Sequence, residues 1–171
     1  MWDAIATGAA AESSLWESAL RPESEQVRTP IFSSLASGEH ALGLETIYEG
    51  YLAHYGTPRL FAPANRDSAL LLGDYLYAHG LVRIAESGDV AAVADLAELI
   101  SLCAQSRAAR RDGDGAAWAA TASSLGEGGL EQARRALSER GDSSLLDAMA
   151  REIAGDDAVD GALVAHARLV G

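Results

Sequence analysis

Residues 44–56 read LETIYEGYLAHYG, and residues 68–78 read SALLLGDYLYA. In the first stretch Leu44, Ile47 and Tyr51 recur at spacings of three and four, which places them on one face of a helix. A glycine and a proline follow directly, and both favour the end of a helix. The two stretches therefore predict two helices joined by a loop at residues 57–65, and this pair decides the expected fold.

The rest of the chain has the composition of a helical protein. All four prolines lie in the first 63 residues. The remainder is rich in alanine, leucine, glutamate and arginine, which are good helix formers, and no alternating pattern predicts a strand. With 171 residues, 49% of them hydrophobic, the chain fits one all-α domain folded as a helical bundle.

Breaks in the hydrophobic pattern divide the chain into eight expected helices. We expect Asp89 to cap one of them, because an aspartate side chain accepts hydrogen bonds from free N–H groups at a helix start. A kink is expected near Ser37-Gly38. The expected helices span residues 3–20, 31–54, 67–87, 89–111, 116–125, 130–139, 143–154 and 157–170.

Charge and cysteine content restrict the class of protein. The net charge of −12 argues against nucleic acid as a ligand and against charge-driven docking on an anionic membrane. No apolar run approaches the roughly 18 residues of a transmembrane helix, and no secretory signal is visible. Cys103 is the only cysteine, so no disulfide can form within the chain, and a cytoplasmic location is expected.

The two helical stretches resemble the trans-polyprenyl diphosphate synthase family. In that family a helix of the form LExIxxxxLxH runs into an aspartate-rich DDxxD motif, and a second helix carries GDYLYA. The resemblance covers roughly residues 42–105. It implies a shortened isoprenoid synthase fold, with family-like helices at about residues 31–111 followed by short helices at about 116–170. The residues that match the first pattern are Leu44, Glu45, Ile47, Leu52 and His54.

The resemblance implies a site whose metal ligands are missing. In the family the aspartates hold Mg²⁺ on an allylic diphosphate, because hard cations prefer oxygen ligands. Here Tyr55 and Gly56 stand at the first two aspartate positions. Arg59 and Arg66 are the candidates for contact with a phosphate. Glu45 and Glu49 are interpreted as part of a solvated helix face.

One literal DDxxD is present, formed by Asp156, Asp157 and Asp160. It follows a glycine at an expected helix start, where acidic residues stabilise the helix dipole and cap free N–H groups. We therefore interpret it as a helix start, with metal binding as the alternative. The four histidines and single cysteine do not form a recognisable zinc site, and no Ser/His/Asp set is apparent.

The resemblance predicts a non-catalytic subunit. Some long-chain (hexa- or heptaprenyl) diphosphate synthases of this family are heterodimers whose small component lacks the DDxxD motifs. Such a chain would bind no cofactor itself, with Mg²⁺ held by a catalytic partner, and it would support that partner and help set product length. The candidate interface residues are Leu72, Leu76, Leu81, Val93, Leu96, Ile100 and Cys103.

Two other functions stay open at this stage. The chain could be an autonomous, Mg²⁺-dependent enzyme that binds a prenyl diphosphate through Asp156, Asp157 and Asp160. It could instead be a helical binding module that forms homo-oligomers, for example a homodimer, and has no part in prenyl transfer.

Overall fold

The computed structural model describes residues 1–170, and these residues form an all-α fold, which confirms the predicted fold class. Within them no strand occurs, apart from one isolated bridge between Leu20 and Phe61. The helices are α1 (Trp2–Glu12), α2 (Ser14–Ala19), α3 (Ala41–Tyr55), α4 (Arg66–Ala85), α5 (Val90–Ala108), α6 (Asp114–Ser123), α7 (Glu131–Arg140), α8 (Ser144–Ala154) and α9 (Asp156–Val170).

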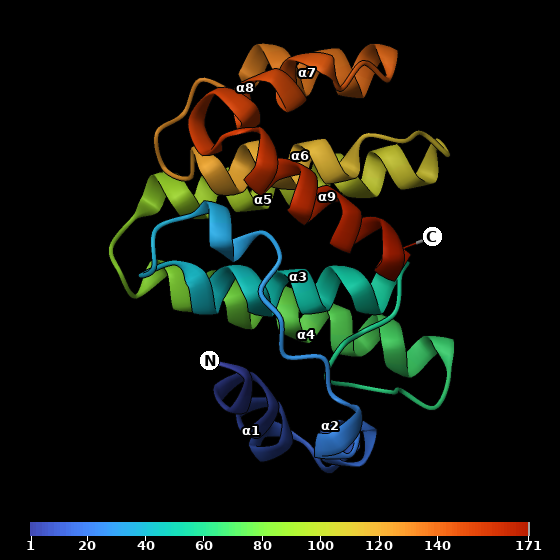
Figure 1. The fold of residues 1–171 in the computed structure, drawn as a ribbon. Coiled ribbons are helices and arrows are strands. Elements are labelled where there is room, and N and C mark those ends of the chain that lie inside the picture. The colour runs from blue at the N-terminus through green and yellow to red at the C-terminus, as the bar shows by residue number, and fades with distance from the viewer. Residues whose placement is uncertain (171) are drawn as a thin grey trace.

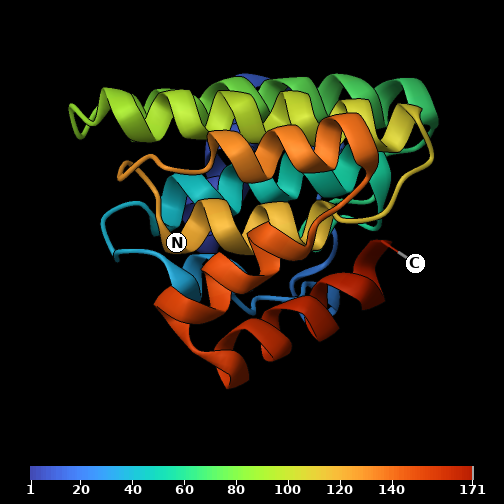
Figure 2. The same cartoon turned by 90° about the horizontal axis from the view of Figure 1, so that it is seen from above.

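The helices surround α3, which runs through the middle of the molecule (Figure 1). Helix α4 lies along α3, and α1 and α2 lie below this pair in the same view. Helices α5 and α6 lie on the other side of α3, with α7 and α8 beyond them. Seen from above, α8 and α9 form the edge opposite α4 and α5 (Figure 2). The two segments that carry the resemblance, residues 44–56 and 68–78, therefore lie beside each other near the centre of the fold.

Helix α3 is buried around its whole circumference. Every residue from 43 to 53 is buried, so the single apolar stripe expected from the sequence understates how much of this helix is covered. Its neighbour α4 runs antiparallel, because Gly50 of α3 meets Gly73 of α4 and Gly43 meets Gly80. A Cβ atom on Gly50 would lie 2.9 Å from the carbonyl oxygen of Gly73, so this helix pair requires glycine at the contact.

The structure corrects two expected helices near the N-terminus. The helix expected at residues 3–20 is broken at Ser13, which has an extended backbone and accepts a hydrogen bond from the N–H of Leu15. The helix expected at residues 31–54 begins only at Ala41. Residues 31–40 form a loop with a short 3₁₀ turn, and the N–H groups of Ile31 and Ser33 in this loop donate to the Glu45 carboxylate.

The starts of the next two helices have side-chain caps. Asp89 accepts a hydrogen bond of 2.9 Å from the N–H of Ala92, as predicted for α5. Helix α4 is capped by Asn65, which accepts from the N–H of Ser68, so the expected start at Asp67 or Ser68 lies slightly late. These caps satisfy N–H groups that have no partner within the helix.

A second hydrophobic cluster joins the N-terminal helices to α4. Ile5, Trp16 and their neighbours pack against Leu72 and Leu76, and all four side chains are buried. The main cluster lies on the other side, between α3, α5, α6, α8 and α9. Helix α4 is therefore covered on two sides by the chain itself.

None of the helices formed by residues 1–170 combines the length and apolar character needed to cross a lipid bilayer.

Candidate functional site

The end of α3, where the resemblance places the metal-binding aspartates, is covered by the C-terminal helix. Gly56 follows α3 directly, and a Cβ atom on it would lie 2.5 Å from the carbonyl oxygen of Leu169 in α9. The N–H of Thr57 donates a hydrogen bond of 2.8 Å to the same carbonyl. An aspartate at position 56 would therefore collide with α9, and only glycine fits this approach.

Two adjoining surface clefts, of about 470 and 420 Å³, open beside this covered position. His54, Tyr55 and Arg66 line both clefts, and Arg107 lines the second. The side chains come from the end of α3, the start of α4 and the end of α5. This cleft pair is the candidate functional site, because it combines an aromatic wall with two guanidinium groups.

Two polar side chains of the cleft pair, His54 and Arg66, differ in their burial and in their contacts with carboxylates. Burial lowers the pKa of His54, although the carboxylate of Asp74, 3.1 Å away, opposes that shift, while the charge of Arg66 adds to it. Neutral imidazole is therefore favoured at pH 7. Arg66 is exposed, and no carboxylate of residues 1–170 lies within ion-pair distance of it. Arg66 is thus the guanidinium of the cleft that is available to a ligand.

Behind the clefts, a buried polar network joins four helices. The hydroxyl group of Tyr51 donates to Asp114, and Arg107 forms an ion pair with the same carboxylate. Burial alone would raise the pKa of Asp114, but the nearby imidazole of His166, whose Nε2 lies 3.8 Å from Oδ1, the hydrogen bond from Tyr51 and the charge of Arg107 outweigh it and lower this pKa. The hydroxyl of Tyr48 lies 2.9 Å from Nδ1 of His166, which ties α9 to α3.

This network was missed by the sequence analysis, which left residues 112–115 outside the expected helices at 89–111 and 116–125. Asp114 is the first residue of α6 and is buried. Nothing in the local sequence distinguishes it from the neighbouring Asp112, because its role depends on Tyr51 and Arg107, which are distant in the chain. His166 was expected to be a surface or hydrogen-bonded core residue, and it is the latter.

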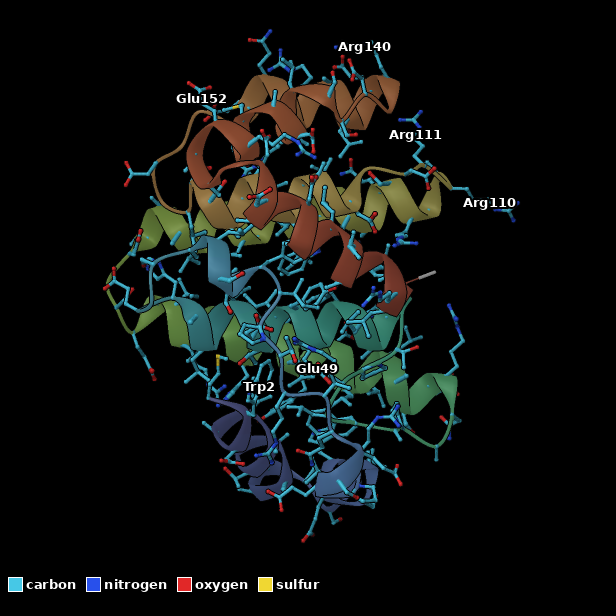
Figure 3. The ribbon with its side chains drawn as sticks, viewed as in Figure 1. Trp2, Glu49, Arg110, Arg111, Arg140 and Glu152 are labelled. Carbon is cyan, nitrogen blue, oxygen red and sulfur yellow. The ribbon has the colours of Figure 1, made fainter. Side chains whose placement is uncertain are left out.

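Arg59, a candidate for phosphate contact in the sequence analysis, is buried and paired with two glutamates of the same chain. Its side chain is fully buried, with Nη1 placed 2.7 Å from Glu45 and Nε placed 3.0 Å from Glu49. The guanidinium group also lies over the rings of Trp2 and Tyr48. Figure 3 shows Glu49 and Trp2 in the interior between α3 and the N-terminal helices, whereas Arg110 lies at the periphery.

The prediction that Glu45 and Glu49 form part of a solvated helix face is also wrong, because both side chains are buried. Their relative exposures are 1% and 0%. Glu45 accepts hydrogen bonds from the N–H of Ile31 and the hydroxyl of Ser33, and Glu49 accepts from the N–H of Leu60. These donors stabilise two buried carboxylates and attach the loop before α3 and the loop after it to this helix.

Four of the seven predicted interface residues lie in the core. Leu72, Leu76, Leu96 and Cys103 are each 1% exposed or less, so they contact the chain's own helices. The half-buried candidates on the outer side of α4 and α5 are Leu81, Val93 and Ile100.

The acidic cluster at Asp156, Asp157 and Asp160 opens α9, as the preferred interpretation predicted. Arg151 lies beside it, 3.4 Å from Asp156 and 2.8 Å from Asp160, and its charge compensates these two carboxylates. Among residues 1–170, no group of three histidine, cysteine, aspartate or glutamate side chains is arranged to hold a metal ion.

Comparison with known proteins identifies no relative: no family model, no curated protein and no solved structure matches this chain. The resemblance carried by residues 44–78 therefore stays a prediction.

Proposed function

We propose that the chain is a non-catalytic subunit of a heteromeric prenyl diphosphate synthase, whose catalytic partner holds the aspartates and Mg²⁺. The supporting observation is the pairing of α3 with α4. The two segments that carry the resemblance lie antiparallel and touch at Gly50 and Gly73, while the aspartate positions hold Tyr55 and Gly56 beneath α9. The helical frame is present and the ligands for a metal are not.

The chemistry of prenyl transfer explains why such a chain needs a partner. The leaving diphosphate must be neutralised, and clustered carboxylates with Mg²⁺ do this in metal-dependent phosphate chemistry. Tyr55 offers a hydroxyl whose pKa is raised by burial, which makes it a poor metal ligand at pH 7. Gly56 offers no side chain and has no room for one. The partner must therefore supply the carboxylates.

Helices α4 and α5, which carry the half-buried candidate interface residues, are the surface we propose for this partner. Val82 and Val90 are 54% and 79% exposed there. The half-buried Leu81, Val93 and Ile100 lie on the same two helices. Large apolar side chains this exposed favour association, because burying them removes apolar surface from water.

Co-expression with a full-length prenyl diphosphate synthase from the same genome tests the proposal. We expect co-purification, and a longer product or higher activity than the synthase shows alone. Val82→Arg is expected to abolish co-purification. Val164→Arg on α9 is the matched control, since Val164 is 53% exposed, and it should leave the complex intact. Prenyl transfer by the purified chain alone would contradict the proposal.

A second candidate function is binding of a prenyl diphosphate at the cleft pair, favoured by the exposed Arg66. Arg66→Gln should then weaken binding of farnesyl diphosphate in a calorimetric titration at least tenfold. Arg168→Gln, which removes an exposed guanidinium from α9, is the control and should leave binding unchanged. Equal binding by the Arg66→Gln variant and the wild-type chain would remove this function.

A further inference from the structure

The turn before α3 brings together a serine, a histidine and an aspartate that the sequence analysis did not connect. Oγ of Ser37 lies 3.1 Å from Nδ1 of His40. On the other side of the ring, Nε2 of His40 lies 3.4 Å from Oδ2 of Asp89. Ser37 is exposed and His40 is 5% exposed, so the hydroxyl faces solvent while the imidazole is held in place.

Each of the three residues is positioned by the backbone around it. The N–H of His40 donates to the carbonyl of Ser37, which closes the turn and sets the serine beside the ring. Asp89 stands at the start of α5, where Oδ1 caps the N–H of Ala92. That cap leaves Oδ2 close to the imidazole, although Nε2 of His40 forms no hydrogen bond within residues 1–170. Asp89 is remote from the turn in sequence, so only the fold could reveal the set.

We propose that Ser37 is a nucleophile toward small, activated carboxylic esters, with His40 as its general base and Asp89 as a positioning residue. The order hydroxyl, imidazole, carboxylate is the arrangement that activates serine in unrelated hydrolases, where it is identified by geometry rather than by sequence position. This esterase activity does not depend on the proposed role as a prenyl synthase subunit.

The proposed hydrolysis has two steps, acylation of Ser37 and hydrolysis of the acyl-serine. Oγ of Ser37 bonds to the ester carbonyl carbon while its proton moves to Nδ1 of His40. The bond from that carbon to the leaving alcohol then breaks, and His40 returns the proton to the alcohol. A water molecule repeats the sequence on the acyl-serine, which releases the carboxylic acid and restores the hydroxyl of Ser37.

The surroundings of Ser37 limit the substrate and the rate. The carboxylate of Glu39 lies 3.4 Å from Oγ and competes with His40 for the hydroxyl proton. Among residues 1–170, the N–H groups of Gly38 and Glu39, which follow Ser37 in the turn, donate to no acceptor. Because Ser37 lies on an exposed turn, the site selects esters by reactivity and small size rather than by a binding cleft.

Purified full-length chain treated with p-nitrophenyl acetate provides the test. We expect release of p-nitrophenol and an acetyl group on Ser37, located by mass spectrometry of peptides. Ser37→Ala should abolish this labelling, and His40→Gln should slow it about 100-fold, within the usual contribution of a general base. Ser34→Ala, at an exposed serine of the same loop whose hydroxyl donates to the carbonyl of Ile31, is the matched control and should react like the wild type.

The Asp89→Asn variant distinguishes the effect of Asp89 on His40 from its effect on folding. Asparagine also caps helices, so this variant should preserve α5. We expect kcat to fall about tenfold with KM unchanged, since Asp89 does not touch the ester. Circular dichroism should match the wild type for every variant. Acetylation of the Ser37→Ala variant at the wild-type rate, or labelling found only at other residues, would overturn the proposal, as would His40→Gln and Asp89→Asn variants that react at full rate.

Discussion

Two pairs of carboxylates in this protein have the same local geometry and opposite surroundings. Glu45 and Glu49 lie one turn apart on α3 and share Arg59. Asp156 and Asp160 lie one turn apart on α9 and share Arg151. The first pair is buried, whereas the aspartate side chains are 78% and 61% exposed. Spacing along a helix alone therefore does not indicate which pair holds the fold together.

The difference lies in what replaces water around the charges. Glu45 and Glu49 accept hydrogen bonds from backbone N–H groups, a serine hydroxyl and a buried guanidinium, so losing one partner leaves a charge without solvation. Around Arg151 and its aspartates, water can replace any lost contact. The two pairs should therefore respond very differently to the same substitutions.

Arg59→Met should have the largest effect. The substitution leaves two buried carboxylates without their cation, and we expect the free energy of unfolding to fall by about 3–5 kcal/mol. Urea denaturation followed by circular dichroism measures this loss. If Arg151→Met causes a similar loss, the ion pairs of Arg59 with Glu45 and Glu49 do not stabilise the fold more than those of Arg151.

Glu49→Gln should change how stability depends on pH. Burial raises the pKa of Glu49 above its ordinary value of 4.5, and Arg59 only partly opposes this shift. The contribution of Glu49 is therefore fully present below pH 4.5 and declines as pH rises through its folded pKa. Relative to the variant, which cannot ionise at position 49, the wild type should lose stability as pH rises above 4.5, as measured by urea denaturation at a series of pH values.

Arg151→Met should lower the melting temperature only slightly, and far less than Arg59→Met. Its ion pairs are exposed, so salt should screen them. In 1 M NaCl the melting temperatures of this variant and the wild type should converge, whereas the effect of Arg59→Met should persist. A deficit for Arg151→Met that is unchanged by salt would contradict this assignment.

Asp157→Ala should have the smallest effect, within about 0.5 kcal/mol, as is usual for surface positions. Millimolar Mg²⁺ should leave the difference between wild type and variant unchanged, as monitored by thermal denaturation. If Mg²⁺ stabilises only the wild type, the alternative of a metal site at Asp156, Asp157 and Asp160 gains support.

Whether a feature was predicted correctly depended on how far apart in the sequence the interacting residues lie. The α5 cap at Asp89 and the acidic start of α9 involve residues within one helical turn, and both were predicted correctly. The break at Ser13 was missed because the sequence around it continues in good helix formers. Arg59 was a candidate for phosphate contact because the resemblance implies arginines after the first motif, and the sequence did not reveal that its carboxylate partners lie on α3.

The sequence by itself determined the all-α class and most helix boundaries, because helix propensity and capping act between residues a few positions apart. Only the tertiary structure decided that α3 is buried on every side, that α9 covers Gly56 and that Ser37, His40 and Asp89 meet. Burial and side-chain contact depend on which surfaces of distant helices pack together, and no local spacing encodes that choice.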